Sequence, residues 1–180
     1  MSADSELNAL RAYLSDFEPY LKSDVVFWTA GSNLPALTLG GLLLIRRTLA
    51  ARRAHLSPIQ LAELDRLESQ ASLHLNRWPV NIEKKAMREI SSRLNVWAAA
   101  LEELGDNYAQ AVYNRAYLAL LLPIVARLPE AERYRQRLNA LDTRLRAAST
   151  SSGFVWEAAL AEAFSPDEFW FLYRQLRLPK

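Results

Sequence analysis

The feature that most constrains this chain is a hydrophobic period near 3.6 residues, which recurs along almost its whole length. Between residues 129 and 148, for example, Tyr134, Leu138, Leu141 and Leu145 follow one another at intervals of four, three and four. This spacing places them on one face of a helix. No segment shows the sustained alternation of apolar and polar residues that is typical of a half-buried strand. The sequence therefore predicts an all-α fold.

Proline, serine and glycine divide this pattern into separate helices. Ser57 and Gln60 have the spacing of a capping box, with Pro58 at the first helical position. Pro19 disfavours helix at the preceding residue, and Pro123 should kink the apolar helix that contains it. The predicted helices cover residues 4–17, 35–55, 58–77, 79–105, 108–127, 129–148, 155–164 and 166–176. Long helices joined by short turns pack antiparallel, so we expect an irregular bundle of six to eight mostly antiparallel helices.

Two segments fall outside the predicted helices. Residues 20–33 include the apolar run Val25–Trp28, which would suit a strand but has no predicted partner strand. We interpret this segment as an apolar connector packed on the core. Residues 149–153, Ser-Thr-Ser-Ser-Gly, form the only low-complexity linker. We therefore predict a single helical domain over residues 1–180, with at most a minor subdivision at 149–153.

The composition argues against several classes of protein. The chain has 22 basic and 20 acidic residues, a formal net charge of +2, whereas dedicated nucleic-acid-binding domains carry a large basic excess. Cysteine is absent, which excludes disulfides, thiol catalysis and cysteine-ligated metals. The two histidines, His55 and His74, belong to no metal-binding motif. We expect no nucleic-acid partner, no metal and no cofactor, and we assign no catalytic residue.

The hydrophobic segments are short. The longest apolar runs, residues 34–45 and 116–126, fall well below the ~20 residues that a membrane span requires. The N-terminal residues MSADSELNAL carry acids where a signal peptide carries positive charge. We therefore expect no membrane span and, by default, a cytoplasmic location.

Arginine accounts for most of the basic residues and clusters on two predicted helices. On the helix predicted over residues 129–148, three arginines lie within about 40° of one another around the helix axis. Such an arrangement can hold phosphates or an acidic partner. The candidate anion contacts are Arg46 and Arg53 on one helix and Arg133, Arg137 and Arg144 on the other. In the alternative interpretation, these side chains extend over an apolar stripe into water. The acids of residues 149–173 could also pair with them.

Aromatic residues crowd the C-terminal segment, where residues 154–173 hold seven rings. In a helix that begins at Pro166, three consecutive rings spread over about 200° of the circumference, more than a terminal helix normally buries. The candidate interface residues are therefore Phe169, Trp170 and Phe171, with Trp28 of the connector. The alternative is that all of these rings belong to the core.

These signals leave three classes of function, in order of preference. The first is a helical protein–protein interaction or scaffold module, whose partner is another protein or a second copy of the chain. The second is a helical bundle that binds a small apolar or anionic ligand. The apolar helix with Pro123 and the pair Gly40–Gly41 could shape a cavity for it. The third is an enzyme of unknown type.

Overall fold

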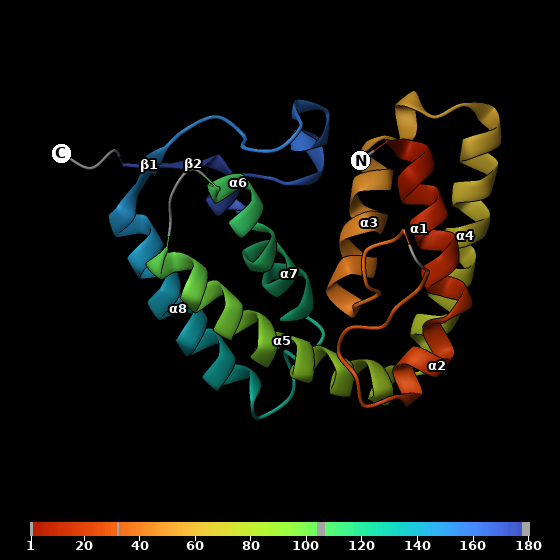
Figure 1. The fold of residues 1–180 in the computed structure, drawn as a ribbon, viewed down its shortest axis with the longest axis horizontal. Coiled ribbons are helices and arrows are strands. Elements are labelled where there is room, and N and C mark those ends of the chain that lie inside the picture. Colours follow the sequence, from red (N-terminus) through yellow and green to blue (C-terminus); the bar gives the residue numbers. More distant parts are fainter. Residues whose placement is uncertain (1, 32, 104–106, 178–180) are drawn as a thin grey trace. The chain divides into compact units, whose positions relative to one another are not determined.

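A computed structural model describes residues 2–31, 33–103 and 107–177. These residues form eight α-helices, three short 3-10 helices and one two-stranded sheet (Figure 1). The mostly helical fold class predicted from the sequence is confirmed, with a small sheet added. The chain divides into two compact units, Met1–Glu89 and Ile90–Lys180, and the division falls within helix α5, Pro79–Glu102.

The first unit is built around three helices whose directions alternate. Besides the first part of α5, its elements are α1 (Ala3–Ser15), α2 (Phe17–Lys22), α3 (Leu39–Ala51), η1 (Arg53–His55) and α4 (Pro58–Arg77). Arg46 of α3 pairs with Glu68 of α4. Arg53, which follows α3, pairs with Asp65, which precedes Glu68 on α4. Helix α3 therefore runs antiparallel to α4, as short connections between long helices favour.

Side-chain caps fix the ends of these helices. The Oγ of Ser57 accepts a hydrogen bond from the backbone of Gln60, and the Gln60 side chain accepts from the backbone of Ser57. The capping box predicted for α4 is confirmed. At the start of α3, the Oγ1 of Thr38 accepts from the Gly41 amide at 2.9 Å. A Cβ at Gly41 would lie 3.1 Å from that same oxygen, so glycine lets the capping hydroxyl approach closely.

Two helix boundaries of the first unit differ from the predictions. Pro19 does not prevent helix at Glu18, because it lies in the first turn of α2, where a backbone amide has no helical acceptor to lose. The helix predicted to begin at Pro35 begins at Leu39 instead. The cause is an antiparallel bridge in which Trp28 and Leu37 exchange two backbone hydrogen bonds, of 3.0 and 2.7 Å, so that residue 37 is extended.

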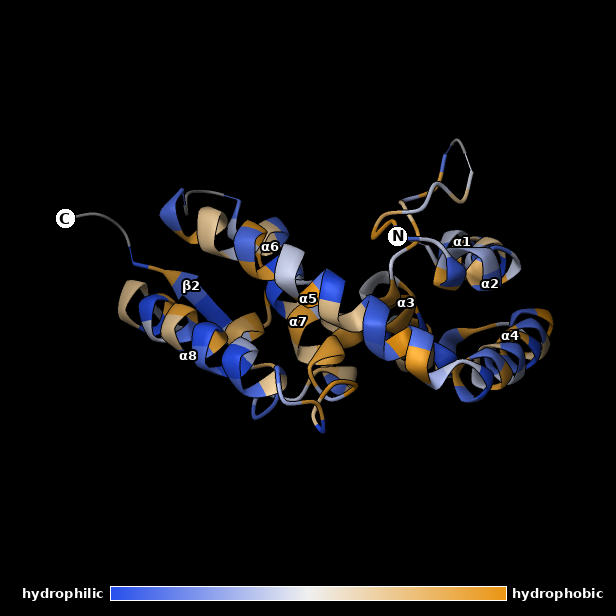
Figure 2. Cartoon of the chain, turned by 90° about the horizontal axis from the view of Figure 1, so that it is seen from below, coloured by the Kyte–Doolittle hydropathy of each residue, from blue (hydrophilic) through white to orange (hydrophobic). Residues whose placement is uncertain are grey.

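The second unit repeats the alternation of helix directions. Besides the second part of α5, its helices are α6 (Tyr108–Ala111), α7 (Tyr113–Leu121) and α8 (Ala131–Ala148). Arg137 of α8 contacts Asn95 of α5, and seven residues later Arg144 pairs with Glu102, so these two helices run parallel. Helix α7 runs antiparallel to α8. Figure 2 shows α7 mostly in the colour of hydrophobic residues, whereas α8 mixes both kinds, with its tyrosine and leucine side chains buried.

The predicted helix over residues 108–127 is shorter and interrupted. It breaks between α6 and α7, and α7 ends at Leu121. Pro123 therefore does not kink a longer helix: residues 122–127 continue as turns, because a proline there clashes with helical backbone one turn earlier. The helix predicted to end at Gly105 is α5, described to Glu102; Gly105 itself lies outside the described residues.

The C-terminal segment differs most from the sequence prediction. The predicted linker 149–153 contains strand β1 (Ser149–Ser151), which pairs antiparallel with β2 (Arg174–Leu176). The two helices predicted over 155–164 and 166–176 are replaced by the 3-10 helices η2 (Ala158–Ala163) and η3 (Trp170–Tyr173) and by β2 itself. The pairing extends beyond the strands, since the Ser152 and Val155 amides donate to Tyr173 and Leu172. These tertiary hydrogen bonds hold the segment extended.

Candidate ligand pocket in the second unit

The aromatic residues predicted as an interface have different environments. Phe169 and Phe171 are fully buried, so the prediction that they form a surface is corrected: the helix from Pro166 on which it depended does not form, and only Trp170–Tyr173 adopt a 3-10 helix. Trp170 is half-buried, with the guanidinium of Arg146 lying 3.6 Å from its ring centre. Trp28, also half-buried, donates from its indole nitrogen to Asp16 at 3.2 Å.

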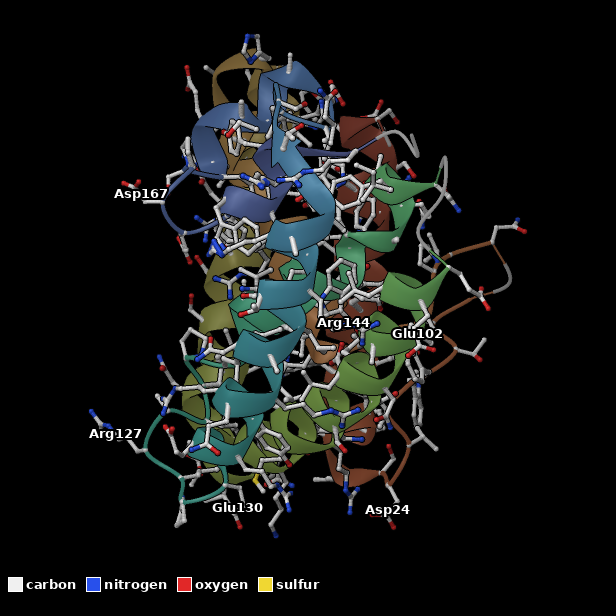
Figure 3. The ribbon with its side chains drawn as sticks, turned by 90° about the vertical axis from the view of Figure 1, so that its left-hand side faces the viewer. Asp24, Glu102, Arg127, Glu130, Arg144 and Asp167 are labelled. Atoms are coloured by element: carbon white, nitrogen blue, oxygen red, sulfur yellow. The ribbon has the colours of Figure 1, made fainter. Side chains whose placement is uncertain are left out.

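The arginines predicted as anion contacts are mostly engaged with the protein itself. Arg46 makes a two-pronged ion pair with Glu68, and Arg53 pairs with Asp65 at 2.8 Å. On α8, Arg137 donates to Asn95, while Arg144 lies 3.9 Å from Glu102 (Figure 3). Arg133 is exposed and lies near the ring of Tyr134. Four of these five arginines are therefore engaged by partners within their own unit.

A pocket does form in the second unit where α7 ends. It has a volume of about 340 Å³, within the usual range for sites that hold small molecules. Helix α7 and the turn after it supply Ala119, Leu122 and Pro123, and α8 supplies Leu138 across from them. Pro123 shapes this wall by ending the helix. Three charged side chains complete the lining, namely Arg115, Arg135 and Glu168.

Arg115 is the unusual member of this lining because it is buried. Its Nε and Nη2 atoms donate to the two carboxylate oxygens of Asp142, at 2.8 and 2.9 Å, and its guanidinium lies 4.4 Å from the ring centre of Phe171. Its Nη1 atom is buried and has no hydrogen-bond partner within the described residues. An unsatisfied buried donor is uncommon in proteins and costs free energy unless something accepts from it.

The other two charged residues lie at more open positions. Arg135 donates to the Ala126 carbonyl at 3.3 Å and lies 3.7 Å from Glu132, with its side chain 40% exposed. Glu168 is exposed and comes from the segment that precedes η3, next to Asp167, which Figure 3 labels at the surface. The pocket therefore combines an apolar wall with two guanidinium groups and one carboxylate. Such a lining suits a ligand with an apolar body and a polar oxygen at one end.

From the sequence, Pro123 is named only as a residue that could help to shape a cavity, and neither Arg115 nor Asp142 is singled out. The only signal in the sequence was the position of a charged residue inside an otherwise apolar helix, with Ala116 and Leu118 beside it. Its partner lies 27 positions further along the chain, and no local pattern links the two.

Comparison of the chain with protein-family models, with curated proteins and with solved structures finds no match. None of the described helices combines the length and apolar character that crossing a bilayer demands. Among residues 2–31, 33–103 and 107–177, no group of three or more histidine and acidic side chains is arranged to hold a metal ion.

Proposed function

We propose that the second unit binds a small amphipathic carboxylate in the pocket at the end of α7. The observation that supports this most directly is the presence of two guanidinium groups, those of Arg115 and Arg135, in the lining of a largely apolar pocket. A carboxylate is the natural partner of a guanidinium group, since its oxygens match the planar set of donors. Asp142 already occupies the other edge of Arg115 and holds it in place.

The remaining lining defines the rest of the ligand. An alkyl chain or a ring would pack against Ala119, Leu122, Pro123 and Leu138, and Arg135 would add a second positive charge. The volume of about 340 Å³ is near the lower end for small-molecule sites, which favours a medium-chain or single-ring acid over a long-chain lipid. Octanoate is a suitable probe of this class.

The experiment is titration calorimetry of octanoate into the full chain. Ala119→Phe places a ring in the pocket without removing any charge, and Ala140→Phe, at an exposed position on α8 outside the pocket, is its matched control. We expect the wild type and Ala140→Phe to bind octanoate and Ala119→Phe to lose at least about tenfold in affinity. Octanol should bind at least about tenfold more weakly than octanoate, because a charged acceptor strengthens the hydrogen bond from arginine.

Two results would contradict this proposal. One is the absence of any octanoate binding to the wild type. The other is equal affinity in Ala119→Phe and Ala140→Phe, since an occluded pocket cannot be the site. Circular dichroism of both variants establishes that they retain the helical fold, so that a loss of binding reports on the pocket.

A second candidate function, a protein-interaction module, is favoured by the connector between α2 and α3. Val25 and Phe27 are 47% and 50% exposed, although both are large apolar residues on a loop. Exposed apolar residues gathered on one loop are typical of protein contacts. Sedimentation of the full chain tests self-association: Phe27→Ser should weaken it, and Val96→Ser, a similarly exposed position on α5, should not. A strict monomer over a wide concentration range would contradict self-association.

A further inference from the structure

The first unit contains a buried lysine whose partners are all neutral. Lys85 of α5 is 1% exposed. Its Nζ donates to the Oγ of Ser23 at 3.0 Å and to the carbonyl of Val25 at 2.5 Å, and it lies 4.2 Å from the ring centre of Tyr20. No carboxylate of the described residues forms an ion pair with it. Burial lowers the pKa of Lys85, and Arg88 lowers it further, against a smaller opposing effect of Asp24.

Lys85 forms part of a small pocket that is rich in positive charge. The pocket has a volume of about 170 Å³ and lies between the end of α2 and the first turns of α5. Four basic side chains line it, together with one acid and one amide: Lys22, Lys84, Lys85, Arg88, Asp24 and Asn81. The lining thus has a formal excess of three positive charges.

The acids near this pocket do not neutralise it. Asp24 pairs with Arg88 at 2.9 Å, but its side chain is 94% exposed, so water screens this pair strongly. Glu18 pairs with Lys22 at 2.6 Å, and both side chains are well exposed. Lys84 is exposed and makes no ion pair with any described residue. The positive charge that remains is concentrated around the buried ammonium group.

We propose that this basic pocket binds a small tetrahedral oxyanion, either free inorganic phosphate or the phosphate group of a small phosphomonoester. A buried charge is normally paired, and Lys85 has only neutral acceptors and an aromatic ring around it. A phosphate group carries about 1.5 to 2 negative charges at neutral pH and several strong acceptor oxygens, which matches the charge excess better than a monovalent carboxylate does. This site lies in the first unit and is independent of the carboxylate pocket proposed above.

The structural alternative is that Lys85 only ties the connector to α5. Its hydrogen bonds to Ser23 and Val25 serve that purpose whether or not an anion is bound. The alternative accounts for Arg88, which donates to the carbonyl and to the carboxylate of Asp24 in the connector, but it gives no role to Lys84. Both side chains are exposed and can be replaced without disturbing the core. Loss of anion affinity in a variant of these two residues that keeps its fold therefore distinguishes a binding site from a purely structural role.

The test is titration calorimetry of the full chain with inorganic phosphate and, separately, with glycerol 3-phosphate, against sodium chloride at equal ionic strength. The variant Lys84→Gln/Arg88→Gln removes two cations of the pocket. The control Arg11→Gln/Arg66→Gln removes two exposed cations elsewhere in the first unit, both paired with Glu63. We expect binding to the wild type and to the control, and at least about tenfold weaker binding to the pocket variant.

The outcomes distinguish free phosphate from a phosphomonoester as the ligand, and a binding site from a purely structural role of Lys85. Tighter binding of glycerol 3-phosphate assigns the site to phosphomonoesters, and tighter binding of inorganic phosphate assigns it to the free ion. The proposal is overturned if neither phosphate compound binds beyond the chloride baseline. It is also overturned if the pocket variant binds as tightly as the wild type, or if the control loses as much affinity as the pocket variant, because the attraction would then be general. Circular dichroism of the variants confirms that the fold is retained.

Discussion

Removing one partner of the ion pair between Arg115 and Asp142 should strongly destabilise the second unit. The side chains of this pair are 8% and 11% exposed, and two short hydrogen bonds join them. Asp142→Leu would leave a buried guanidinium group with neither a counter-charge nor an acceptor. A change of this kind costs about 3–5 kcal/mol of the free energy of unfolding. That is a large part of the roughly 5–15 kcal/mol that stabilises a typical protein.

The double variant Arg115→Met/Asp142→Leu provides the decisive comparison. It removes both charges and retains an unbranched side chain against the ring of Phe171, where a thioether packs well. We expect it to lie within about 1 kcal/mol of the wild type, because replacing a buried ion pair by apolar residues removes the desolvation cost of both charges. The interaction energy from the cycle should therefore exceed about 2 kcal/mol.

The assay is urea unfolding followed by circular dichroism, with the exposed pair of Arg144 and Glu102 as the control. Those side chains are 51% and 68% exposed, and 3.9 Å separates their charged atoms. Arg144→Met should therefore cost less than about 1 kcal/mol. The reasoning is refuted if Asp142→Leu costs less than about 1 kcal/mol. It is also refuted if the double variant loses as much free energy of unfolding as Arg115→Met and Asp142→Leu lose when added together.

Three further predictions concern stability. Ser57→Ala should destabilise the protein by about 0.5–2 kcal/mol in urea unfolding, because it removes the acceptor at the start of α4, whereas Ser72→Ala at an exposed position of the same helix should change little. Trp97 is fully buried and its indole nitrogen has no hydrogen-bond partner among the described residues. Trp97→Phe should therefore cost much less than the about 3–5 kcal/mol expected for Trp97→Ala, and equal costs would contradict this assignment. Burial raises the pKa of Glu6 above its ordinary value of 4.5, against the opposing effect of Arg52, so the folded protein retains this proton at pH values where the unfolded chain has lost it. Glu6 thus adds stability as the pH falls through its raised pKa towards 4.5, and Glu6→Gln should remove that part of the pH dependence; an unchanged pH profile of urea unfolding would count against it.

The helices that could be predicted are those whose signals are local. In α8, the residues that follow the spacing of four and three are buried at Tyr134, Leu138, Leu141 and Leu145. In α4, the capping box at Ser57 forms as expected. A periodic stripe and a cap both act within one or two turns of the chain, so the sequence contains all the information that they require.

The C-terminal segment could not be predicted because tertiary contacts determine its backbone. Ser151 pairs with Arg174 across the small sheet, and the Oγ of Ser149 accepts from the Arg174 side chain at 3.0 Å. Each strand is only three residues long, too short for an alternating pattern to register. Without knowledge of the distant partner strand, the residues of β1 indicate a linker and those of β2 indicate the end of a helix.

The candidate pocket shows the same limit for charged residues. Arg115 and Arg137 both lie on helices of the second unit, and helical periodicity gives no reason to distinguish their roles. The difference comes from what lies opposite each of them: Arg115 faces the carboxylate of Asp142 in the core, whereas Arg137 reaches an amide oxygen of Asn95 at the surface. Arg115 is a candidate ligand contact because its position against Asp142 also places it in the lining of the pocket. That position depends on α7 and α8 together, so it can be recognised only in the folded unit.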